Sequence, residues 1–235
     1  MLQAVVPDSV APLVNDYGDF LITDFLGDHK DPALPAGFQA YLVEQRAPEL
    51  RPHFHEVDQF QVVVGGDGTL GRDQISNGAV HYTEGYTSYG PIRTEEPLAY
   101  FTLRAEPTTG INYMPEERRK RAEAGGGGEH FTAQVAVGQP TGGQLELIAR
   151  SPRGAVAYAC HLAADVALTS AQTSELAAER GYVVVLDGVA QLAEQVLPAR
   201  SILAFSQPSE VAGLSAAASS EGGASVALMT FAPAR

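Results

Sequence analysis

The 235-residue sequence contains no tryptophan and a single cysteine, Cys160. One thiol cannot close a disulfide within a chain, which excludes a disulfide-stapled secreted scaffold. No run of about 18 apolar residues is present, so the sequence predicts no helical membrane span and no membrane partner. The first residues also lack the basic flank and the long apolar core of a secretory signal. We therefore expect a protein of the cytoplasm.

Basic residues are also scarce, with 15 Lys and Arg against 28 Asp and Glu, and the formal net charge is −13. A surface of this sign repels phosphate backbones, so nucleic acid is not an expected partner. The densest basic run, at 116–121, includes acidic residues and is followed by glycines. A charge run of this kind is typical of a solvated helix end.

Helical periodicity is weak, with short candidates only at 115–124 and 174–179, whereas strand signals recur along the chain. The strand candidates are short, rich in Val, Tyr, Phe and Thr, and bounded by turn-forming residues, as in a sandwich or barrel. The sequence therefore predicts an all-β fold. The candidate strands lie at 38–45, 58–66, 78–85, 98–107, 143–150, 154–163, 180–188 and 224–233.

Four consecutive glycines, Gly125–Gly128, form the clearest break in the chain. Glycine loses the most conformational entropy on folding, so such a run favours a linker over an ordered element. Each side holds about 100 residues, which is enough for a small barrel. We therefore expect an N-terminal domain at 1–124, a linker at 125–130 and a C-terminal domain at 131–235.

Two histidines one residue apart, His53 and His55, lie just before the strand candidate at 58–66. In an extended strand, residues i and i+2 point to the same face about 7 Å apart, so both imidazoles can enter one cavity. Imidazole binds Zn, Cu, Fe and Ni alike, so the pair predicts a metal site without choosing the metal. The alternative is a pair that only hydrogen-bonds within a polar cavity.

The stretch around this pair resembles the first sequence motif of the cupin superfamily, in which His-x-His is followed by a glutamate and then a glycine. His53, His55 and Gly66 fit that motif. Gln59 stands at the glutamate position, and Ala47 stands where the motif begins with glycine. The likeness therefore depends on the histidine pair and on the glycine-rich turn.

A second cupin motif would fall at 77–92. There Gly85 fits, while Thr83 replaces the proline and Ser88 replaces the metal-binding histidine. The half from about residue 131 has the rhythm of a second, degenerate unit without His-x-His. The resemblance implies a bicupin, with two tandem double-stranded β-helix (jelly-roll) barrels and the function in the first.

The resemblance also implies a ligand set for a divalent Fe, Ni, Mn or Zn ion. The ligands would be His53, His55 and Gln59, with His81 as the candidate for the missing histidine. An amide oxygen is a weaker donor than a carboxylate, so a pocket that uses no metal at all is the alternative. The residues expected to line a substrate pocket are Gln61, Ser88, Tyr89 and Arg104.

Three functions follow from this interpretation. The first is a metal-dependent enzyme of the dioxygenase type that acts on a small anionic organic substrate. The second is a non-catalytic bicupin, for small-molecule binding or structure, whose metal site has decayed. The third is metal-free epimerisation with Tyr89 and a histidine as the acid-base pair. The apolar face of Phe60, Val62 and Val64 needs a packing partner, and we expect a homodimer.

Overall fold

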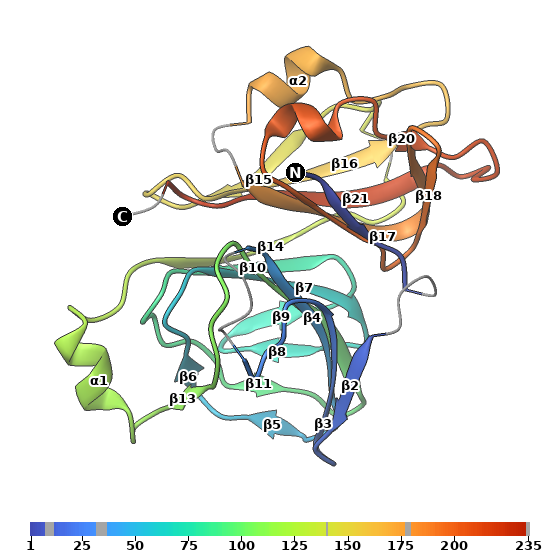
Figure 1. Cartoon of the computed structure of the whole chain (residues 1–235). Coiled ribbons are helices and arrows are strands. Elements are labelled where there is room, and N and C mark those ends of the chain that lie inside the picture. The colour runs from blue at the N-terminus through green and yellow to red at the C-terminus, as the bar shows by residue number, and fades with distance from the viewer. Residues whose placement is uncertain (8–11, 32–36, 140, 177–179, 234–235) are drawn as a thin grey trace. The chain divides into compact units, whose positions relative to one another are not determined.

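The chain folds into two compact units, one of residues 12–132 and one of residues 133–235 together with the first residues of the chain (Figure 1). None of the helices among the described residues is long and apolar enough to cross a membrane. The computed structural model describes residues 1–7, 12–31, 37–139, 141–176 and 180–233.

The N-terminal unit contains two sheets and a short two-stranded ribbon. The large sheet has the strand order β14-β10-β7-β12-β4-β3-β2, the small sheet has the order β5-β11-β8-β9, and β6 pairs with β13. The strands are β2 (Leu13–Asp16), β3 (Phe20–Leu26), β4 (Gln39–Gln45), β5 (Glu49–Leu50), β6 (His53–Phe54), β7 (Gln59–Gly65), β8 (Gly68–Leu70), β9 (Asp73–Ile75), β10 (Ala79–Thr83), β11 (Ile92–Arg93), β12 (Leu98–Arg104), β13 (Asn112–Tyr113) and β14 (His130–Gln134).

Alternation along β7 places one set of side chains between the two sheets. Gln61 and Val63 share a face because successive side chains of a strand point to opposite sides. Val63 packs in one apolar cluster with Leu70 and Ile92 of the small sheet. Removing this shared apolar surface from water holds the two sheets together. The prediction of an all-β fold is confirmed.

The C-terminal unit is built around one long strand, β17. Its main sheet has the order β1-β19-β17-β21-β16-β15, and β18 and β20 also pair with β17. The strands are β1 (Gln3–Val5), β15 (Glu146–Arg150), β16 (Val156–Leu162), β17 (Gly181–Leu192), β18 (Gln195–Pro198), β19 (Ile202–Phe205), β20 (Ser215–Ala216) and β21 (Ala224–Thr230).

Strand β17 takes part in both halves of this unit because it changes partners along its length. Its first residues pair with β19, and its last residues pair with β18 and β20. Between them, the register against β21 shifts after Val185. Gly188 follows with φ of 73°, and a Cβ there would lie 2.1 Å from the carbonyl oxygen of Gly223. Only glycine fits this bend without strain.

The helices are short and do not set the fold. Helix α1 (Arg118–Glu123) lies in the N-terminal unit and buries no residue, and it falls within the candidate at 115–124. Helix α2 (Ser170–Ser174) begins with a Thr169 cap, and a 3-10 helix, η1, covers Pro208–Val211. The other helix candidate, 174–179, begins where α2 ends, and its residues 177–179 lie outside the described residues.

The first strand of the chain belongs to the C-terminal unit. Strand β1 pairs with β19 in an antiparallel register that sets Ala4 opposite Leu203. A three-residue strand carries too little pattern to reveal its partner, whereas the sequence assigned all residues before 125 to the first domain. The structure therefore differs from the expected domain bounds at this end.

The glycine run lies against the N-terminal unit. The amide of Gly128 donates to Thr87 Oγ1 at 2.7 Å, and a Cβ at Gly128 would lie 2.0 Å from Glu84 Oε2. The glycine is thus needed for close approach. Strand β14 then begins at His130 and joins the large sheet beside β10. The compact unit continues to residue 132, past the linker expected at 125–130.

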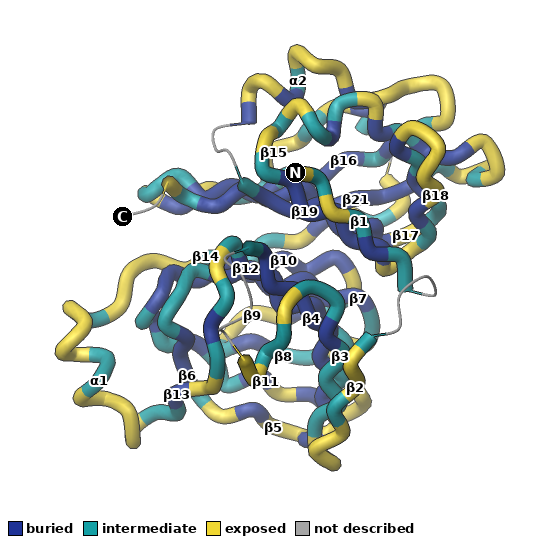
Figure 2. Tube along the Cα trace, viewed as in Figure 1, coloured by how far each residue is buried: buried dark blue, intermediate teal, exposed yellow. Residues whose placement is uncertain are grey.

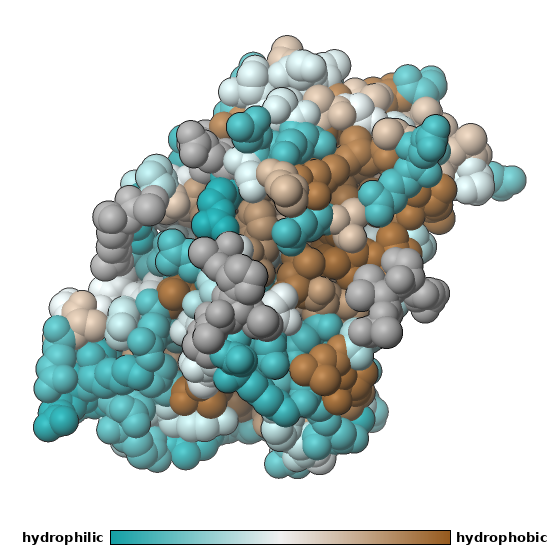
Figure 3. Space-filling model, viewed as in Figure 1, coloured by the Kyte–Doolittle hydropathy of each residue, from teal (hydrophilic) through white to brown (hydrophobic). Residues whose placement is uncertain are grey.

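Burial is concentrated on the central strands of each unit, while α1 and the loops beside it are exposed (Figure 2). An exception to apolar burial occurs at edge strand β2. Leu13 and Val14 are 51% and 53% exposed, and a hydrophobic patch is visible over this strand (Figure 3). Single exposed apolar residues are common and need no special explanation.

Candidate metal and ligand site in the N-terminal barrel

The two histidines of the His-x-His pair are buried in the N-terminal unit. His53 lies in β6 and His55 directly follows it, with 1% and 8% of their surfaces exposed. Their rings lie 5.3 Å apart between centres, at 82° to each other. The residue between them, Phe54, is also fully buried and contacts the ring of Tyr86.

Backbone carbonyls fix the tautomer of both imidazoles. Nδ1 of His53 donates to the carbonyl oxygen of Arg51 at 2.8 Å, and Nδ1 of His55 donates to the carbonyl oxygen of Gly110 at 3.0 Å. A carbonyl only accepts, so each Nδ1 must carry the hydrogen. In the neutral rings, each Nε2 therefore offers a lone pair.

A directed chain of hydrogen bonds ends on His53. Arg104 donates to Gln59 Oε1 from Nε at 3.1 Å and from Nη2 at 2.9 Å. Because guanidinium only donates, the amide orientation is fixed, and Gln59 Nε2 donates to the Tyr89 hydroxyl at 2.6 Å. The Tyr89 hydroxyl in turn donates to His53 Nε2 at 2.8 Å. Every hydrogen in this chain points toward His53.

Arg104 is the largest side chain in the fully buried set, with 1% exposed. Besides Gln59, its Nη1 donates to Gln39 Oε1 at 2.7 Å, and its guanidinium lies 5.3 Å from the ring centre of Tyr41. Both partners come from β4, which is hydrogen-bonded to β12. The cation is therefore held in place by the wall of the barrel.

Burial keeps the histidines neutral. Loss of solvent, together with the nearby charge of Arg104, lowers the pKa of His53 to about 4. Burial, followed by Arg104 and His53, holds the pKa of His55 well below its usual value. Burial also raises the pKa of Tyr89. At pH 7 the site therefore contains two neutral imidazoles and a protonated phenol beside one guanidinium.

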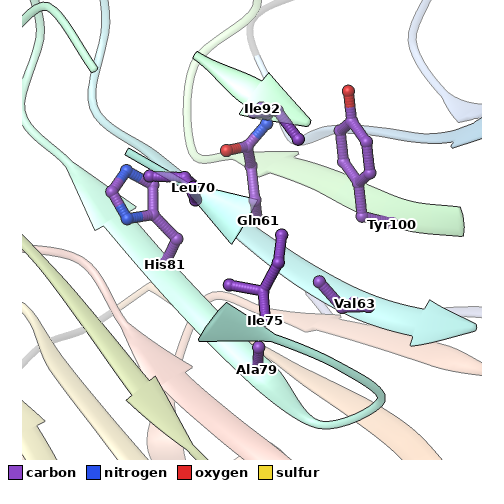
Figure 4. Close-up of a pocket in the computed structure, with 8 residues that line it drawn as sticks. All are labelled: Gln61, Val63, Leu70, Ile75, Ala79, His81, Ile92 and Tyr100. Atoms are coloured by element: carbon purple, nitrogen blue, oxygen red, sulfur yellow. The ribbon is translucent and has the colours of Figure 1, made fainter. Parts of the chain in front are cut away.

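A second group of predicted residues lines a small cavity between the two sheets (Figure 4). His81 of β10 lies directly opposite Gln61 of β7 in the antiparallel register. Both side chains line the same space, whose volume is about 10 Å³. The lining residues are Gln61, Val63, Leu70, Ile75, Ala79, His81, Ile92 and Tyr100.

The donors around His53 fit a metal ion only in part. Two imidazoles bound through Nε2 at about 2.1 Å to one tetrahedral ion have ring centres about 5 Å apart, as His53 and His55 do. Gln59 does not fit as a ligand in this arrangement, because Arg104 occupies its carbonyl oxygen. Tyr89 also occupies the His53 lone pair. An ion would have to displace that hydroxyl.

The structure brings some predicted site residues together and not others. Tyr89 and Arg104 join His53 and Gln59 in one network. Gln61 and His81 both line the cavity, and the His81 ring lies 5.1 Å from that of Tyr89. Ser88 is half-buried and lies outside the cavity lining, and its neighbour Tyr89 is the residue that reaches His53.

Sequence reasoning missed Gln39 and Tyr41, which hold Arg104 in place. The available signal was the alternation along 39–45, which sets Gln39, Tyr41, Val43 and Gln45 on one face of a strand.

A third group of side chains that could bind a metal lies apart from the histidine pair and from the cavity. Asp24, Asp28 and His29 place their donor atoms within 4.8 Å of one another. Nδ1 of His29 already bonds Asp24 Oδ2 at 2.7 Å, and its Nε2 bonds the hydroxyl of Tyr17 at 2.9 Å. Both nitrogens are engaged within the protein, so the histidine of this cluster is satisfied by hydrogen bonds.

No protein-family model and no curated protein matches the sequence. Solved structures do match. A bacterial pirin from Escherichia coli in complex with nickel(II) is 12% identical, with a TM-score of 0.60 over 100% of both chains. The 11S globulin of Wrightia tinctoria, described with an auxin binding site, is 10% identical, with a TM-score of 0.60 over 100% of this chain and 84% of that one.

An oxalate decarboxylase of Lactobacillus farciminis in complex with formate is 9% identical, with a TM-score of 0.58 over 95% of this chain and 85% of that one. These identities are low, so the likeness concerns the fold. All three are cupin-superfamily proteins, and the predicted jelly-roll class is confirmed. The chain therefore has the cupin fold, as two tandem β-barrel units.

Proposed function

We propose that the N-terminal barrel binds a divalent transition-metal ion through Nε2 of His53 and Nε2 of His55. The observation that carries the proposal is the anchoring of both Nδ1 atoms on backbone carbonyls. Histidines that ligate metals commonly donate their other ring N–H to such a group, which fixes the tautomer and the ring orientation. The identity of the ion remains open among Fe, Ni, Mn and Zn.

The protonation state of the site supports this proposal. Metal binding requires neutral imidazole, and burial holds the pKa of His53 at about 4 and that of His55 well below its usual value. No proton has to leave either ring at pH 7. The nickel-bound pirin, which shares the fold, is consistent with an ion in a barrel of this kind.

The charge of Arg104 favours an anionic organic molecule as the second ligand of the site. The guanidinium is buried and influences the pKa of both histidines, so its field reaches the space beside them. Gln59 then orients Arg104 and Tyr89 and leaves coordination to other donors. When bound, the ion would act as a Lewis acid toward oxygen atoms of the molecule. Oxygen-dependent cleavage of that molecule is the enzymatic form of the proposal.

A second candidate function is a metal-free pocket for a small molecule, with or without acid-base chemistry. The observation that favours it is the completed chain from Arg104 through Gln59 and Tyr89 to His53, which satisfies each member without an ion. Homodimer formation and a cytoplasmic location stay predictions.

The two candidates are separated by metal analysis and titration calorimetry. Protein purified without chelator is analysed for transition metals and titrated with Ni²⁺, Zn²⁺ and Mn²⁺, together with His53→Ala and the control His161→Ala. His161 lies in the C-terminal unit and bonds Ser225. The proposal predicts one ion per chain, with affinity lowered at least 100-fold in His53→Ala alone. Equal uptake by all three proteins, or no uptake, contradicts it.

A further inference from the structure

Strands β2 and β3 form a hairpin at one edge of the large sheet (Figure 1), and Tyr17 lies in its turn. The Tyr17 hydroxyl lies 2.9 Å from Nε2 of His29, and Nδ1 of the same ring lies 2.7 Å from Asp24 Oδ2. The backbone amide of His29 also donates to Asp24 Oδ1 at 3.1 Å. An acid, an imidazole and a hydroxyl are therefore joined in one line of hydrogen bonds.

Asp24 fixes which nitrogen of the His29 ring carries the hydrogen. The partner of Nδ1 is a carboxylate, which only accepts hydrogen bonds, so Nδ1 donates. In the neutral ring Nε2 then has a lone pair, and the Tyr17 hydroxyl donates to it. This order of groups activates a nucleophile, because the histidine accepts the proton of the hydroxyl while the acid orients the ring and stabilises the imidazolium.

Exposure to solvent increases along this line from the acid to the hydroxyl. The side chains of Asp24 and His29 are 2% and 13% exposed, whereas Tyr17 is 52% exposed. The His29 ring packs against the ring of Tyr41, with 5.7 Å between their centres. Asp24 Oδ2 also accepts from Asn15 Nδ2 at 3.3 Å. The acid and the base are thus held in place by the sheet, while the hydroxyl is open to a molecule from solution.

The charges around Tyr17 restrict the kind of molecule that it can attack. The ammonium group of Lys30 lies 5.4 Å from the ring centre of Tyr17 and donates to Asn15 Oδ1. A cation in this place can stabilise negative charge that develops during an attack. Four further acidic residues lie within two positions of Tyr17 or His29 in the sequence, namely Asp16, Asp19, Asp28 and Asp31. This acidic surrounding repels phosphate and sulfate groups and favours a neutral electrophile.

We propose that Tyr17 is a nucleophile that accepts acyl groups from neutral, activated carboxylic esters, with His29 as its general base. The phenol oxygen forms a bond to the carbonyl carbon while the phenolic proton passes to His29 Nε2. The bond from this carbon to the leaving oxygen then breaks, and His29 returns the proton to that oxygen. The products are the free alcohol or phenol and an O-acylated Tyr17, and the step needs neither an oxidant nor a reductant. Because the product is itself an aryl ester, the donor must be an ester of comparable or greater reactivity. This site does not depend on a metal at His53.

Labelling of the wild-type protein with p-nitrophenyl acetate tests the proposal. Tyr17 should gain one acetyl group at least about 100-fold faster than N-acetyltyrosine amide in the same solution, which is the smallest rate increase typical of a positioned general base. Peptide mass spectrometry over time locates the acetyl group and measures its rate. Acetylation of Tyr17 at the rate of the free amide overturns the proposal. So does acetylation of Lys30 or of other residues without Tyr17.

Variants then identify the base. In His29→Gln the hydroxyl stays but its proton acceptor is lost, so the acetylation rate of Tyr17 should fall about 100-fold, with circular dichroism to check the fold. The matched control is His130→Gln, which replaces an exposed histidine of the same unit and should keep the wild-type rate. An unchanged rate in His29→Gln, or an equal fall in His130→Gln, contradicts the proposal. The comparison with the free amide uses the wild type alone, so it decides the question even where His29→Gln does not fold.

Discussion

The two barrels share a fold but fill their interiors with opposite chemistry. The N-terminal interior carries buried His53, His81 and Arg104, each committed to specific hydrogen bonds. The C-terminal interior is one apolar cluster, in which Leu162, Val185 and their neighbours are almost fully buried. The side chains named in both interiors are buried, so exposure does not explain the difference.

The contrast distinguishes side chains that are buried for stability from side chains that are buried for function. Apolar side chains gain free energy simply by leaving water, whereas each buried polar group must first recover the hydrogen bonds it loses. The N-terminal barrel accepts this cost for histidine, glutamine and arginine side chains, whereas the buried polar residues described in the C-terminal unit are serines and threonines. We infer that the C-terminal barrel is built for stability and that the N-terminal barrel retains polar groups for binding. Four predictions test this contrast.

The two barrels should differ most in how much stability they lose at acid pH. In the metal-free protein, burial holds the pKa of His53 at about 4 and that of His81 at about 3, both below the usual 6.5. Between those values the unfolded chain binds more protons, so the stabilisation present above pH 6.5 is lost as the pH falls toward the folded pKa values. At about 1.4 kcal/mol per pH unit for each histidine, two histidines lose about 5 kcal/mol by pH 4.5.

Hydrogen exchange read by mass spectrometry at pH 6.5 and pH 4.5 checks this prediction for each unit separately. Peptides of the N-terminal unit should lose protection first, because His161 is the only histidine of residues 133–235. Equal loss in both units, or earlier loss in the C-terminal unit, would contradict the assignment of buried neutral histidines to the first barrel.

The next largest effect concerns the apolar barrel. Phe205 in β19 is fully buried in the C-terminal cluster. Replacing it by alanine leaves a cavity and should lower the free energy of unfolding by about 4 kcal/mol. Urea denaturation followed by circular dichroism measures this change. Ion affinity at the N-terminal site should stay at the wild-type value in the folded variant, and a parallel loss of affinity would show that the barrels are not separable in this way.

A smaller decrease in the free energy of unfolding is expected from Arg104→Met. The variant removes both donors to Gln59 Oε1, whereas Gln39 Oε1 keeps the Thr108 N–H as a donor. One unpaired buried acceptor costs about 2 kcal/mol. Removing the cation should also raise the pKa of His53, since Arg104 lowers it. Denaturation and NMR titration of the imidazoles measure the two effects. A neutral or stabilising result would mean that the polar interior imposes no such constraint.

The smallest effect is a change in ion affinity, and it is expected from Tyr89→Phe. The variant removes the hydroxyl that donates to His53 Nε2 and leaves the ring in place. Because an ion must compete with this hydrogen bond, worth about 1 kcal/mol, ion affinity should rise about fivefold. Calorimetric titration against the wild type measures the change. Weaker binding would instead identify the phenol oxygen as a ligand.

The fold could be predicted from the sequence because its signals are local. Short runs rich in β-branched and aromatic residues, bounded by turn residues, identify strands without knowledge of their partners. The pairing of β1 with β19 could not be predicted in this way. Three residues contain no usable pattern, and their partner strand lies about 200 residues away in the chain.

The site could be predicted only where spacing carries the information. The i, i+2 spacing of His53 and His55 was enough to place both in one interior. The register at 88–89 was not predictable, since a shift of one residue exchanges which side chain faces inward. Gln59 was assigned to a metal because its partner, Arg104, lies 45 residues away in the sequence. Contacts of this kind appear only once the strands are paired.

The most direct test of the contrast between the barrels is anomalous diffraction from crystals grown with Ni²⁺ or Zn²⁺, with data collected at the metal edge. Our account predicts one strong peak per chain at about 2.1 Å from Nε2 of both His53 and His55, with the Tyr89 hydroxyl displaced and no peak in the C-terminal barrel. No peak at the histidine pair, or a peak only at Asp24, Asp28 and His29, would contradict it.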